Sequence, residues 1–428
     1  MSRSILGLVS SWLIAIALVA EVAPARAEAA APEAGATALS LEDVLSLAKE
    51  RAPEVSLARQ AVREAEARRV GAGVRLPTNP RLSVDARPVL RGASASDVGY
   101  AATLDALFEV NGAPGARREE ADRAVDVAAT DLRVGRLDAR ARAFAAYVRA
   151  RVAEMRMGEI AFAVELAERV LAASSERTNL GAAGDIERTL AESELGTLRA
   201  AASARDEEHR RALMALRDAL DLPAEAPIRL TTALDDPGAV AAPPALAAAA
   251  EQGLADLEAI RRRADLLAVT EERLAREAFP KVGGYLGVDS SPVSPTFGVV
   301  GLSVELPIAQ RNQGPRARAA AQRATEMERL SLTARRVARD VYAAHAAYEA
   351  RRRELKILTD EALPSAQRTL DLATTGWRSG RFDIFRVTSA ARDLARVRAL
   401  RLDALESAWL EKIALERAVG AEGKWTAR

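Results

Sequence analysis

Residues 100–117 read YAATLDALFEVNGAPGAR, and residues 300–318 read VGLSVELPIAQRNQGPRAR. In both stretches apolar and polar residues alternate with a period of two, which is typical of a strand with one apolar face. A turn containing asparagine and glycine then leads to Pro114 or Pro315, and proline suits the first turn of a helix. The two prolines lie 201 positions apart. A strand that runs into a helix twice, at this spacing, predicts a duplicated unit.

The duplication extends well beyond these stretches. Tyr147 and Tyr348 are also 201 positions apart, whereas Gly181 and Gly380 are 199 apart. Each unit is expected to contain a helix, a strand pair and a long helical hairpin. The expected boundaries are a signal peptide at 1–27, a first repeat at 28–222 with strands in 81–110 and a hairpin at 115–220, a proline-rich linker or equatorial segment at 223–244, a second repeat at 245–420 with strands in 281–307 and a hairpin at 315–418, and a tail at 421–428.

The strand stretches predict one continuous apolar face. Its large members are Leu82, Val84, Leu104, Phe108, Leu286, Val288, Val300, Leu302 and Val304. The acidic residues Asp85, Asp105, Asp289 and Glu305 alternate with them and should face water. Each stretch has about the 9–11 residues that a tilted strand needs to cross a bilayer, although a half-exposed soluble hairpin has the same pattern. The aromatic residues Tyr100, Phe108, Tyr285 and Phe297 are candidates for the membrane interface, or reflect strand preference alone.

The helical stretches are unusually long. Residues 115–178 contain no proline and repeat apolar residues every seven positions, which predicts a coiled-coil rod of roughly 95 Å. The return helix, 185–220, is shorter, so another segment must complete that side of the coil. A helix over 245–278 is expected as the counterpart of 41–74, which has a potential break at Pro53. Pro364 interrupts the second hairpin, where the helix either bends or divides into two pieces.

The N-terminal segment and the composition indicate where in the cell the protein is found and which partners it lacks. Arg3, an apolar run at 5–20 and the sequence Ala25-Arg26-Ala27 predict a cleaved signal peptide, with an uncleaved anchor as the alternative. Removal of residues 1–27 takes two of 61 basic and one of 60 acidic residues, leaving 59 of each, which gives no electrostatic indication of nucleic-acid binding. There is no cysteine, so neither a lipoprotein anchor nor a disulfide is expected. After residue 27 no apolar run reaches membrane-helix length, so strands must make any membrane crossing.

No constellation typical of catalysis is found. The two histidines, His209 and His345, lie in predicted coils without another histidine nearby, and a helix-surface or packed position is the expected role of each. There is no phosphate-binding glycine loop and no nucleophile elbow. The sequence therefore predicts a protein that is not an enzyme, with no cofactor and no metal site.

Several short motifs, in order along the chain, resemble the TolC-like outer-membrane factor family. They are LSLEDVL at 39–45, APE at 52–54, LPTNPRL at 76–82, LPSA at 363–366 and GWRSGRFDIF at 376–385. The resemblance implies a mainly α protein with a small β part: long coiled-coil helical hairpins form a periplasmic α-barrel, and four strands per subunit contribute to a trimeric 12-stranded outer-membrane β-barrel. It also implies a homotrimer in contact with outer-membrane lipid in a Gram-negative bacterium.

The segment LPIAQRNQG at 306–314 is similar to the strand-to-helix entry of the CzcC-like heavy-metal branch. An ordinary helix-entry turn is the alternative interpretation. This likeness implies a passive conduit for heavy-metal cations that works with a periplasmic adaptor (membrane fusion) protein and an inner-membrane RND-type pump. Export of drugs or other small molecules, or type I secretion, stays open.

The resemblance places the periplasmic entrance and the adaptor-docking surface at the two hairpin tips. The tip residues are Gly181, Gly184, Asp185, Glu187, Gly376, Trp377, Gly380, Asp383 and Arg386. Known members carry acidic residues about two turns beyond the tip glycine, but here the second of the two equivalent positions is Arg386 instead of an acid. We hypothesise that Glu187 and Arg386 pair between neighbouring coils and hold the entrance shut, against the alternative of ordinary surface charges.

Two other classes of protein share some of these features. A periplasmic adaptor would have one coiled hairpin and compact β-rich modules, whereas this chain has two hairpins, each preceded by a strand pair. A soluble structural coiled coil would leave the alternating strands unexplained. Partition into the outer-membrane fraction would separate these alternatives from a channel.

Overall fold

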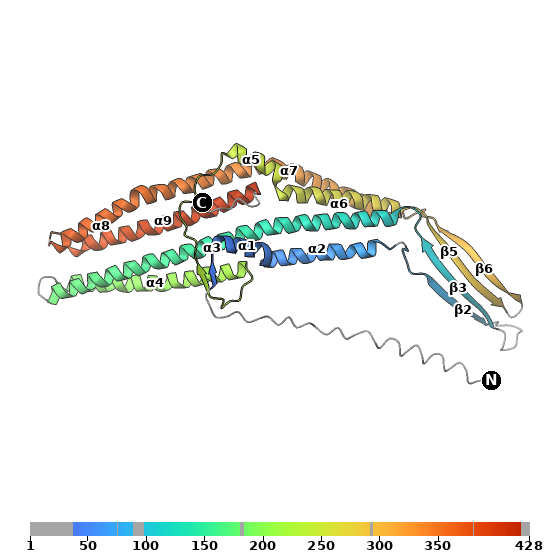
Figure 1. The fold of residues 1–428 in the computed structure, drawn as a ribbon, viewed down its shortest axis with the longest axis horizontal. Helices are drawn as coiled ribbons and strands as arrows, with labels where there is room; N and C mark the ends of the chain where they lie inside the picture. The colour runs from blue at the N-terminus through green and yellow to red at the C-terminus, as the bar shows by residue number, and fades with distance from the viewer. Residues whose placement is uncertain are drawn as a thin grey trace, which may run out of the picture.

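The computed structural model describes residues 37–74, 76–88, 98–179, 184–291, 294–379 and 381–420. The expected signal peptide and the tail at 421–428 lie outside these residues. The molecule is a long rod with all four strands of its larger sheet at one end and two helical hairpin tips at the other (Figure 1).

The helices account for most of the chain. They are α1 (Leu41–Arg51), α2 (Pro53–Ala72), α3 (Ala113–Asn179), α4 (Asp185–Ala219), α5 (Pro243–Gly253), α6 (Ala255–Glu277), α7 (Gln313–Ile357), α8 (Leu363–Arg378) and α9 (Ile384–Val419). The predicted rod at 115–178 is confirmed as α3, whose 67 residues span about 100 Å. The short return helix α4 ends near the middle of the rod, and α2 continues the packing against α3 beyond it (Figure 1).

Both predicted entry helices are divided. Ser40 caps α1 through a reciprocal pair of hydrogen bonds with Asp43, and the chain breaks before Pro53 as expected. The single helix expected at 245–278 is wrong, because Leu254 is extended and separates α5 from α6. Gly253 weakens the helix at this point, and Leu254 packs against Gly420, where an added Cβ would lie 2.9 Å from its Cδ1 atom.

Pro364 lies in a bend. The five residues Leu358–Ala362 form a π-helical turn between α7 and α8, and the flanking residues Ile357 and Leu363 keep right-handed helical dihedral angles. A π-turn supplies the slack that the missing N–H and the bulky ring of proline require. The predicted bend is therefore confirmed, and the helix does not divide into two separate pieces.

The strands are β2 (Arg81–Pro88), β3 (Val98–Phe108), β5 (Lys281–Ser291) and β6 (Ser294–Glu305), in the antiparallel order β2-β3-β5-β6. Leu82 pairs with Leu104, Leu104 with Leu286, and Leu286 with Val300. Because paired residues share a face, this register places all nine predicted apolar residues on one surface.

Tyr285 and Phe297 lie on the polar face of the sheet, whereas side chains at a membrane interface are expected on the apolar face. Tyr285 pairs with Asp105 and Gly301, and Phe297 pairs with Asp289. The sequence placed both among interfacial candidates on composition, but residue parity along the strand decides the face. The ring of Tyr285 covers Gly301, where an added Cβ would lie 2.3 Å from the ring.

A second, two-stranded sheet, which the sequence pattern does not predict, lies at the middle of the rod. Strands β1 (Thr37–Leu39) and β4 (Ile228–Leu230) pair in parallel, and the proline-rich linker at 223–244 continues across the helices. Two repeat-related tyrosines hold this linker: the Tyr147 hydroxyl accepts a hydrogen bond from Thr232 N at 2.9 Å, and the Tyr348 hydroxyl donates to Gly238 O. The main core cluster, which includes Phe144 and Trp409 with ring centroids 5.6 Å apart, lies here.

Candidate functional site at the hairpin tips

The first tip joins α3 to α4. Gly184 is the N-cap of α4, and its carbonyl accepts a hydrogen bond from Glu187 N at 3.0 Å. Its φ of −83° is open to any residue, so the backbone at this position does not require glycine. Asp185 is exposed in the first turn of α4, 3.5 Å from Arg188. Gly181 lies outside the described residues.

The second tip depends on a close approach to Gly376. An added Cβ there would lie 2.2 Å from the ring of Phe382, so only glycine leaves room for this packing. The Gly376 carbonyl accepts hydrogen bonds from Arg381 N at 2.8 Å and Phe382 N at 3.2 Å, which closes the end of α8. Asp383 caps α9 by accepting from Arg386 N at 3.1 Å. Gly380 lies outside the described residues.

Trp377 joins the two hairpins. Its side chain is buried beside Ile384 and Val387 in a cluster that Val170 of α3 also contacts. The Arg177 guanidinium of α3 lies over the Trp377 ring, 5.5 Å from its centroid. This tryptophan was predicted from the tip motif as part of the entrance, and the structure places it between the hairpins within one chain.

Glu187 and Arg386, the predicted closing pair, form no ion pair with each other in the described part of the single chain. Arg386 instead lies over the Phe382 ring at 4.9 Å. The Oε2 atom of Glu187 is buried without a hydrogen-bond partner among the described residues.

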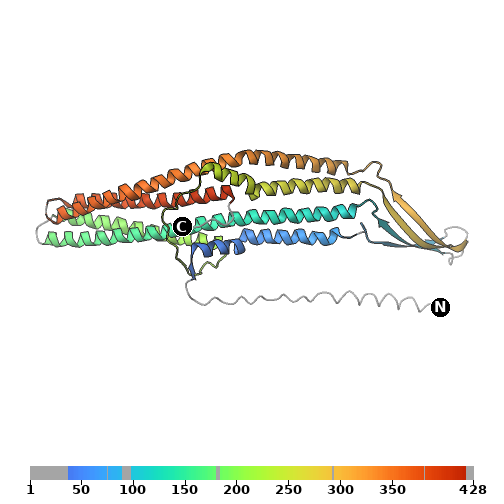
Figure 2. The ribbon, with the colours of Figure 1, turned by 45° about the horizontal axis from the view of Figure 1, so that its top comes forward.

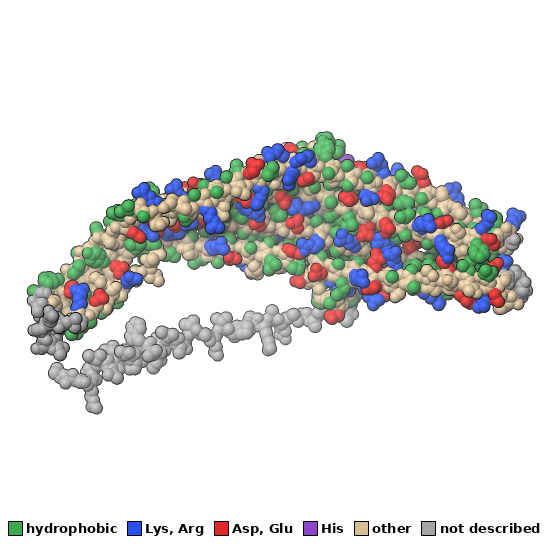
Figure 3. All heavy atoms as spheres, turned by 180° about the vertical axis from the view of Figure 1, so that it is seen from behind, with side chains coloured by type: hydrophobic (Ala, Val, Ile, Leu, Met, Phe, Trp, Pro, Cys, Tyr) green, Lys and Arg blue, Asp and Glu red, His purple; other side chains and the backbone are tan. Residues whose placement is uncertain are grey.

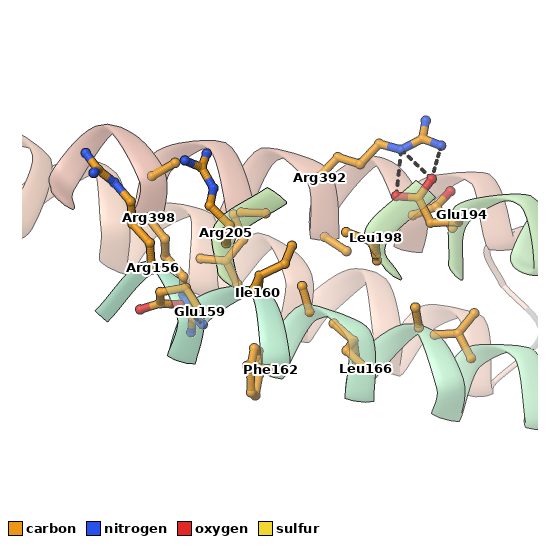
Figure 4. A pocket seen from close by; sticks show the side chains of 18 of the residues that line it. Arg156, Glu159, Ile160, Phe162, Leu166, Glu194, Leu198, Arg205, Arg392 and Arg398 are labelled. Atoms are coloured by element: carbon orange, nitrogen blue, oxygen red, sulfur yellow. Dashed lines mark hydrogen bonds and ion pairs between the residues drawn. The ribbon is translucent and has the colours of Figure 1, made fainter. Parts of the chain in front are cut away.

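An apolar groove runs behind the tips between α3, α4 and α9, with a cavity volume of about 170 Å³ (Figure 4). Ile160, Leu166 and Leu198 line it. Its rim is ionic: Arg392 donates to Glu194 at 3.1 Å, and Arg398 donates to Glu159 at 2.8 Å. The sequence did not reveal this groove, because its walls come from three helices that are distant along the chain.

Arg156 holds the two hairpins together at the inner end of the groove. From α3 it donates to Glu208 of α4 at 2.8 Å and to Asp403 and Glu406 of α9 at 2.6 and 2.9 Å. The Arg156 side chain is 15% exposed, and its charged hydrogen bonds are therefore poorly screened. Arginine fits this position because its several N–H groups reach three carboxylates at once.

A buried carboxyl lies where α9 passes the linker. Burial raises the pKa of Glu416 to about 7, and the positive charges of Lys412 and Arg140 offset this only in part. Lys412 donates to Pro237 O of the linker at 2.7 Å and lies 4.0 Å from Glu416. Burial in turn lowers the pKa of Lys412.

The sheet end of the rod has a different surface. Charged side chains are dense over the helices and sparse over the strand end, where apolar and backbone atoms prevail (Figure 3). All nine predicted apolar residues are exposed, from 41% for Leu104 to 86% for Val300. Such a large uncovered apolar face is unusual for a surface in water. None of the helices within the described ranges combines the length and apolarity needed to cross a bilayer.

Comparisons with known proteins agree with this geometry. Residues 246–421 match the model of the outer membrane efflux protein family. The cobalt-zinc-cadmium resistance protein CzcC of Cupriavidus metallidurans is 27% identical over 405 residues, which cover 91% of this chain and 92% of that protein.

Solved structures share the fold. A crystal structure of CusC has a TM-score of 0.75 at 18% identity, covering 92% of this chain and 96% of that chain. The outer-membrane protein VceC of Vibrio cholerae has a TM-score of 0.70 at 16% identity, covering 89% and 96%. The match to the family model, the similarity to CzcC and the shared fold of these structures together support an outer membrane efflux factor.

Proposed function

We propose that this efflux channel protein acts as a homotrimer, a passive conduit from periplasm to exterior that spans the outer membrane with its strands. The observation that carries the proposal is the four-stranded sheet, with an apolar, exposed face and two open edges. Open edges in lipid leave backbone groups without hydrogen bonds, at a cost of several kcal/mol each. Three copies supply twelve strands and remove every edge. The nine apolar residues then face lipid, and the acidic residues face the lumen.

The helical rod extends the conduit through the periplasm, where we propose that the tips contact a periplasmic adaptor and, through it, an inner-membrane RND-type pump. Exposed tip residues such as Asp185 and Arg386 are available for this contact. A conduit needs no catalytic group or bound cofactor, because cargo diffuses through water and tight ligation slows its release.

We propose heavy-metal cations as the cargo. The support is the CzcC relative, which covers nearly all of this chain, together with the 306–314 motif. A strain that lacks this protein should accumulate cobalt, zinc or cadmium and regain resistance when the gene is restored. Unchanged metal accumulation with increased sensitivity to organic drugs would overturn the metal assignment and favour a drug channel.

The channel itself is tested in planar lipid bilayers. Purified protein should insert and give ohmic steps of uniform size, whereas absence of conductance from correctly folded protein would contradict the conduit.

We further propose that Glu187 pairs with Arg386 between neighbouring coils to hold the entrance closed. Exposed pairs are worth under about 1 kcal/mol each, but a ring contains three. Glu187→Ala and Arg386→Ala should each raise the closed-state conductance, and an unchanged closed state would reject the pairing.

A further inference from the structure

The polar face of the four-stranded sheet contains three glycines. The strands β2, β3, β5 and β6 extend from the ends of α2, α3, α6 and α7 and form one sheet beyond the helices (Figure 2). Gly283 and Gly287 of β5 and Gly301 of β6 lie on the same face as Asp105, because paired residues share a face and every second residue of a strand does. Glycine inside a strand often marks a place where another group approaches closely.

Each of these glycines is covered by the side chain of the residue opposite it on a neighbouring strand. The pairs are Tyr285–Gly301, Thr103–Gly287 and Ser303–Gly283. A Cβ atom added at the glycine would lie between 2.3 and 2.6 Å from the opposite side chain in all three pairs. Side chains cannot approach each other so closely, so the three larger residues occupy space that only glycine leaves free.

Tyr285 is the largest of these side chains, and it lies along the sheet. A side chain in a strand ordinarily stands roughly perpendicular to the sheet. A Cβ atom added at Gly301, on the next strand, would meet the far end of the Tyr285 ring, with Cζ and the hydroxyl oxygen both at 2.3 Å. The ring therefore reaches across from β5 to β6 instead of projecting from the face. An aromatic ring over a strand glycine also shields the exposed backbone.

The surroundings of the ring leave it one other position. Along β5, the spaces over the two flanking glycines are already occupied by Thr103 and Ser303. On the β3 side, Tyr285 pairs with Asp105. A side chain introduced at Gly301 would therefore displace the ring away from the sheet, into the space that this face borders.

In the proposed trimer this face lines the lumen, so the position of the ring affects the bore. Twelve strands spaced about 4.8 Å apart and tilted by about 40° give a barrel with a backbone radius of about 12 Å. Three-fold symmetry places the three Tyr285 rings at one height. Because side chains fill part of this radius on every side, three upright rings narrow the water-filled lumen, whereas three flat rings leave it open.

We infer that Tyr285 and Gly301 set the bore of the channel near the middle of β5: the glycine lets the ring lie flat against the wall, and the lumen stays wide enough for larger water-soluble solutes. The inference rests on the proposed trimeric channel and adds the residues that determine its size limit. Because the phenol side chain is neutral at physiological pH, the limit acts on the size of a solute and not on its charge.

Labelling of a single engineered thiol from outside the cell tests this inference, since the chain contains no native cysteine. Glu305→Cys lies on the same face as Gly301, four residues or about 13 Å nearer the helices. A reagent that enters from the strand end must therefore pass the ring. Maleimide-polyethylene glycols of graded mass should label Glu305→Cys up to a cut-off mass. Adding Gly301→Val should slow labelling by polymers just below that mass by about fivefold or more, while a small maleimide keeps its rate.

Two further variants control this result, each made in the Glu305→Cys protein. Gly298→Val is the matched substitution, because Gly298 lies on the opposite face of β6 and an added Cβ there meets nothing within 4 Å. It should leave the cut-off mass unchanged. Gly301→Val/Tyr285→Ala should restore labelling by the large polymers, because the double variant has no ring to displace.

Tyr285→Ala alone gives a second measurement that does not depend on the folding of Gly301→Val. A ring that lies flat occupies little of the lumen, so its removal should leave the cut-off mass unchanged. A higher cut-off for Tyr285→Ala, or an equal cut-off for Gly301→Val and the Glu305→Cys protein, in trimers that conduct in lipid bilayers, overturns the inference and leaves the proposed function intact. A protein that forms no trimer or gives no conductance overturns both.

Discussion

Single side chains in this molecule act mainly by joining helices that are distant in the sequence. Glu416 and Arg156 show two opposite electrostatic situations. Glu416 is a carboxyl buried with only partial compensation by Lys412 and Arg140, whereas Arg156 is a guanidinium surrounded by three carboxylates. The first costs stability when it ionises, and the second stabilises the contact between the hairpins as long as it keeps its charge.

Glu416→Gln should make the protein more stable at pH 8 by about 2 kcal/mol. It should also remove the decrease in folding stability that the wild-type protein shows as the pH rises toward 7. The folded pKa of about 7 lies above the ordinary value of 4.5, so between these pH values the folded chain holds a proton that the unfolded chain has released. Stability therefore falls as pH rises through this window, and the penalty is complete above pH 7. Thermal midpoints from pH 5 to pH 8 measure the effect, with Glu411→Gln on the same helix as control. Parallel pH profiles for wild type and Glu416→Gln would contradict the assignment.

Arg156→Met should destabilise the protein by about 2 kcal/mol, since it leaves the carboxylates of Glu208, Asp403 and Glu406 close together without a counter-charge. Arg169→Met removes only an exposed pair with Glu165 on one helix and should change stability by less than about 0.5 kcal/mol. Chemical denaturation in detergent compares the two variants. Equal effects would show that Arg156 is an ordinary surface charge.

At the scale of elements, the tips and the linker depend on particular packing contacts. Gly376→Ala should destabilise the second tip by about 2 kcal/mol, because the added methyl group displaces the Phe382 ring. Gly376→Ala/Phe382→Ala should regain most of this loss. Gly196→Ala in α4, where an added Cβ meets nothing within 4 Å, should instead be neutral or stabilising. Thermal unfolding midpoints of these variants measure the effect. An unchanged midpoint for Gly376→Ala would contradict the prediction and show that the Phe382 ring moves aside without loss of stability.

The linker should loosen when its tyrosine contacts are removed. Tyr147→Phe leaves Thr232 N without its acceptor and should cost about 2 kcal/mol. Protease cleavage within 223–244 should accelerate in this variant and in Tyr348→Phe. Tyr342→Phe, whose side chain is 47% exposed, serves as control. Cleavage at the wild-type rate in both linker variants would mean that backbone pairing alone holds the segment.

Local periodicity explains why most elements could be predicted from the sequence. The alternation of apolar and polar residues predicts the apolar face of the strands, and the long stretch without proline predicts α3. Both signals are local, because each is read from consecutive residues of the sequence. The break at Leu254, the β1–β4 pair and the Arg156 contacts could not be predicted, since each depends on residues brought together only by the fold. The tip was found from its motif, but the burial of Trp377 between hairpins required the structure.

At the scale of the whole molecule, a single chain leaves surfaces exposed that folded proteins normally cover. Its sheet has two open edges, its apolar face is uncovered, and α7 is exposed where the repeat-related α3 is not. The α3–α6 contact contains the ion pairs Arg133–Glu258 and Asp131–Arg263, whereas the positions of α7 that correspond to Arg133 and Asp131 are the exposed Ala334 and Leu332. Each feature follows if the folded unit is a closed ring of copies.

The mass of the detergent-extracted particle tests this account most directly. Light scattering coupled to size exclusion, corrected for bound detergent, should give three chain masses in a single monodisperse peak. Backbone pairing between the edge strands of neighbouring copies predicts that this mass persists in high salt, because contacts between uncharged groups are not weakened by screening. A monodisperse particle of one chain mass, or a protein that stays in solution without detergent, would contradict the closed trimeric channel.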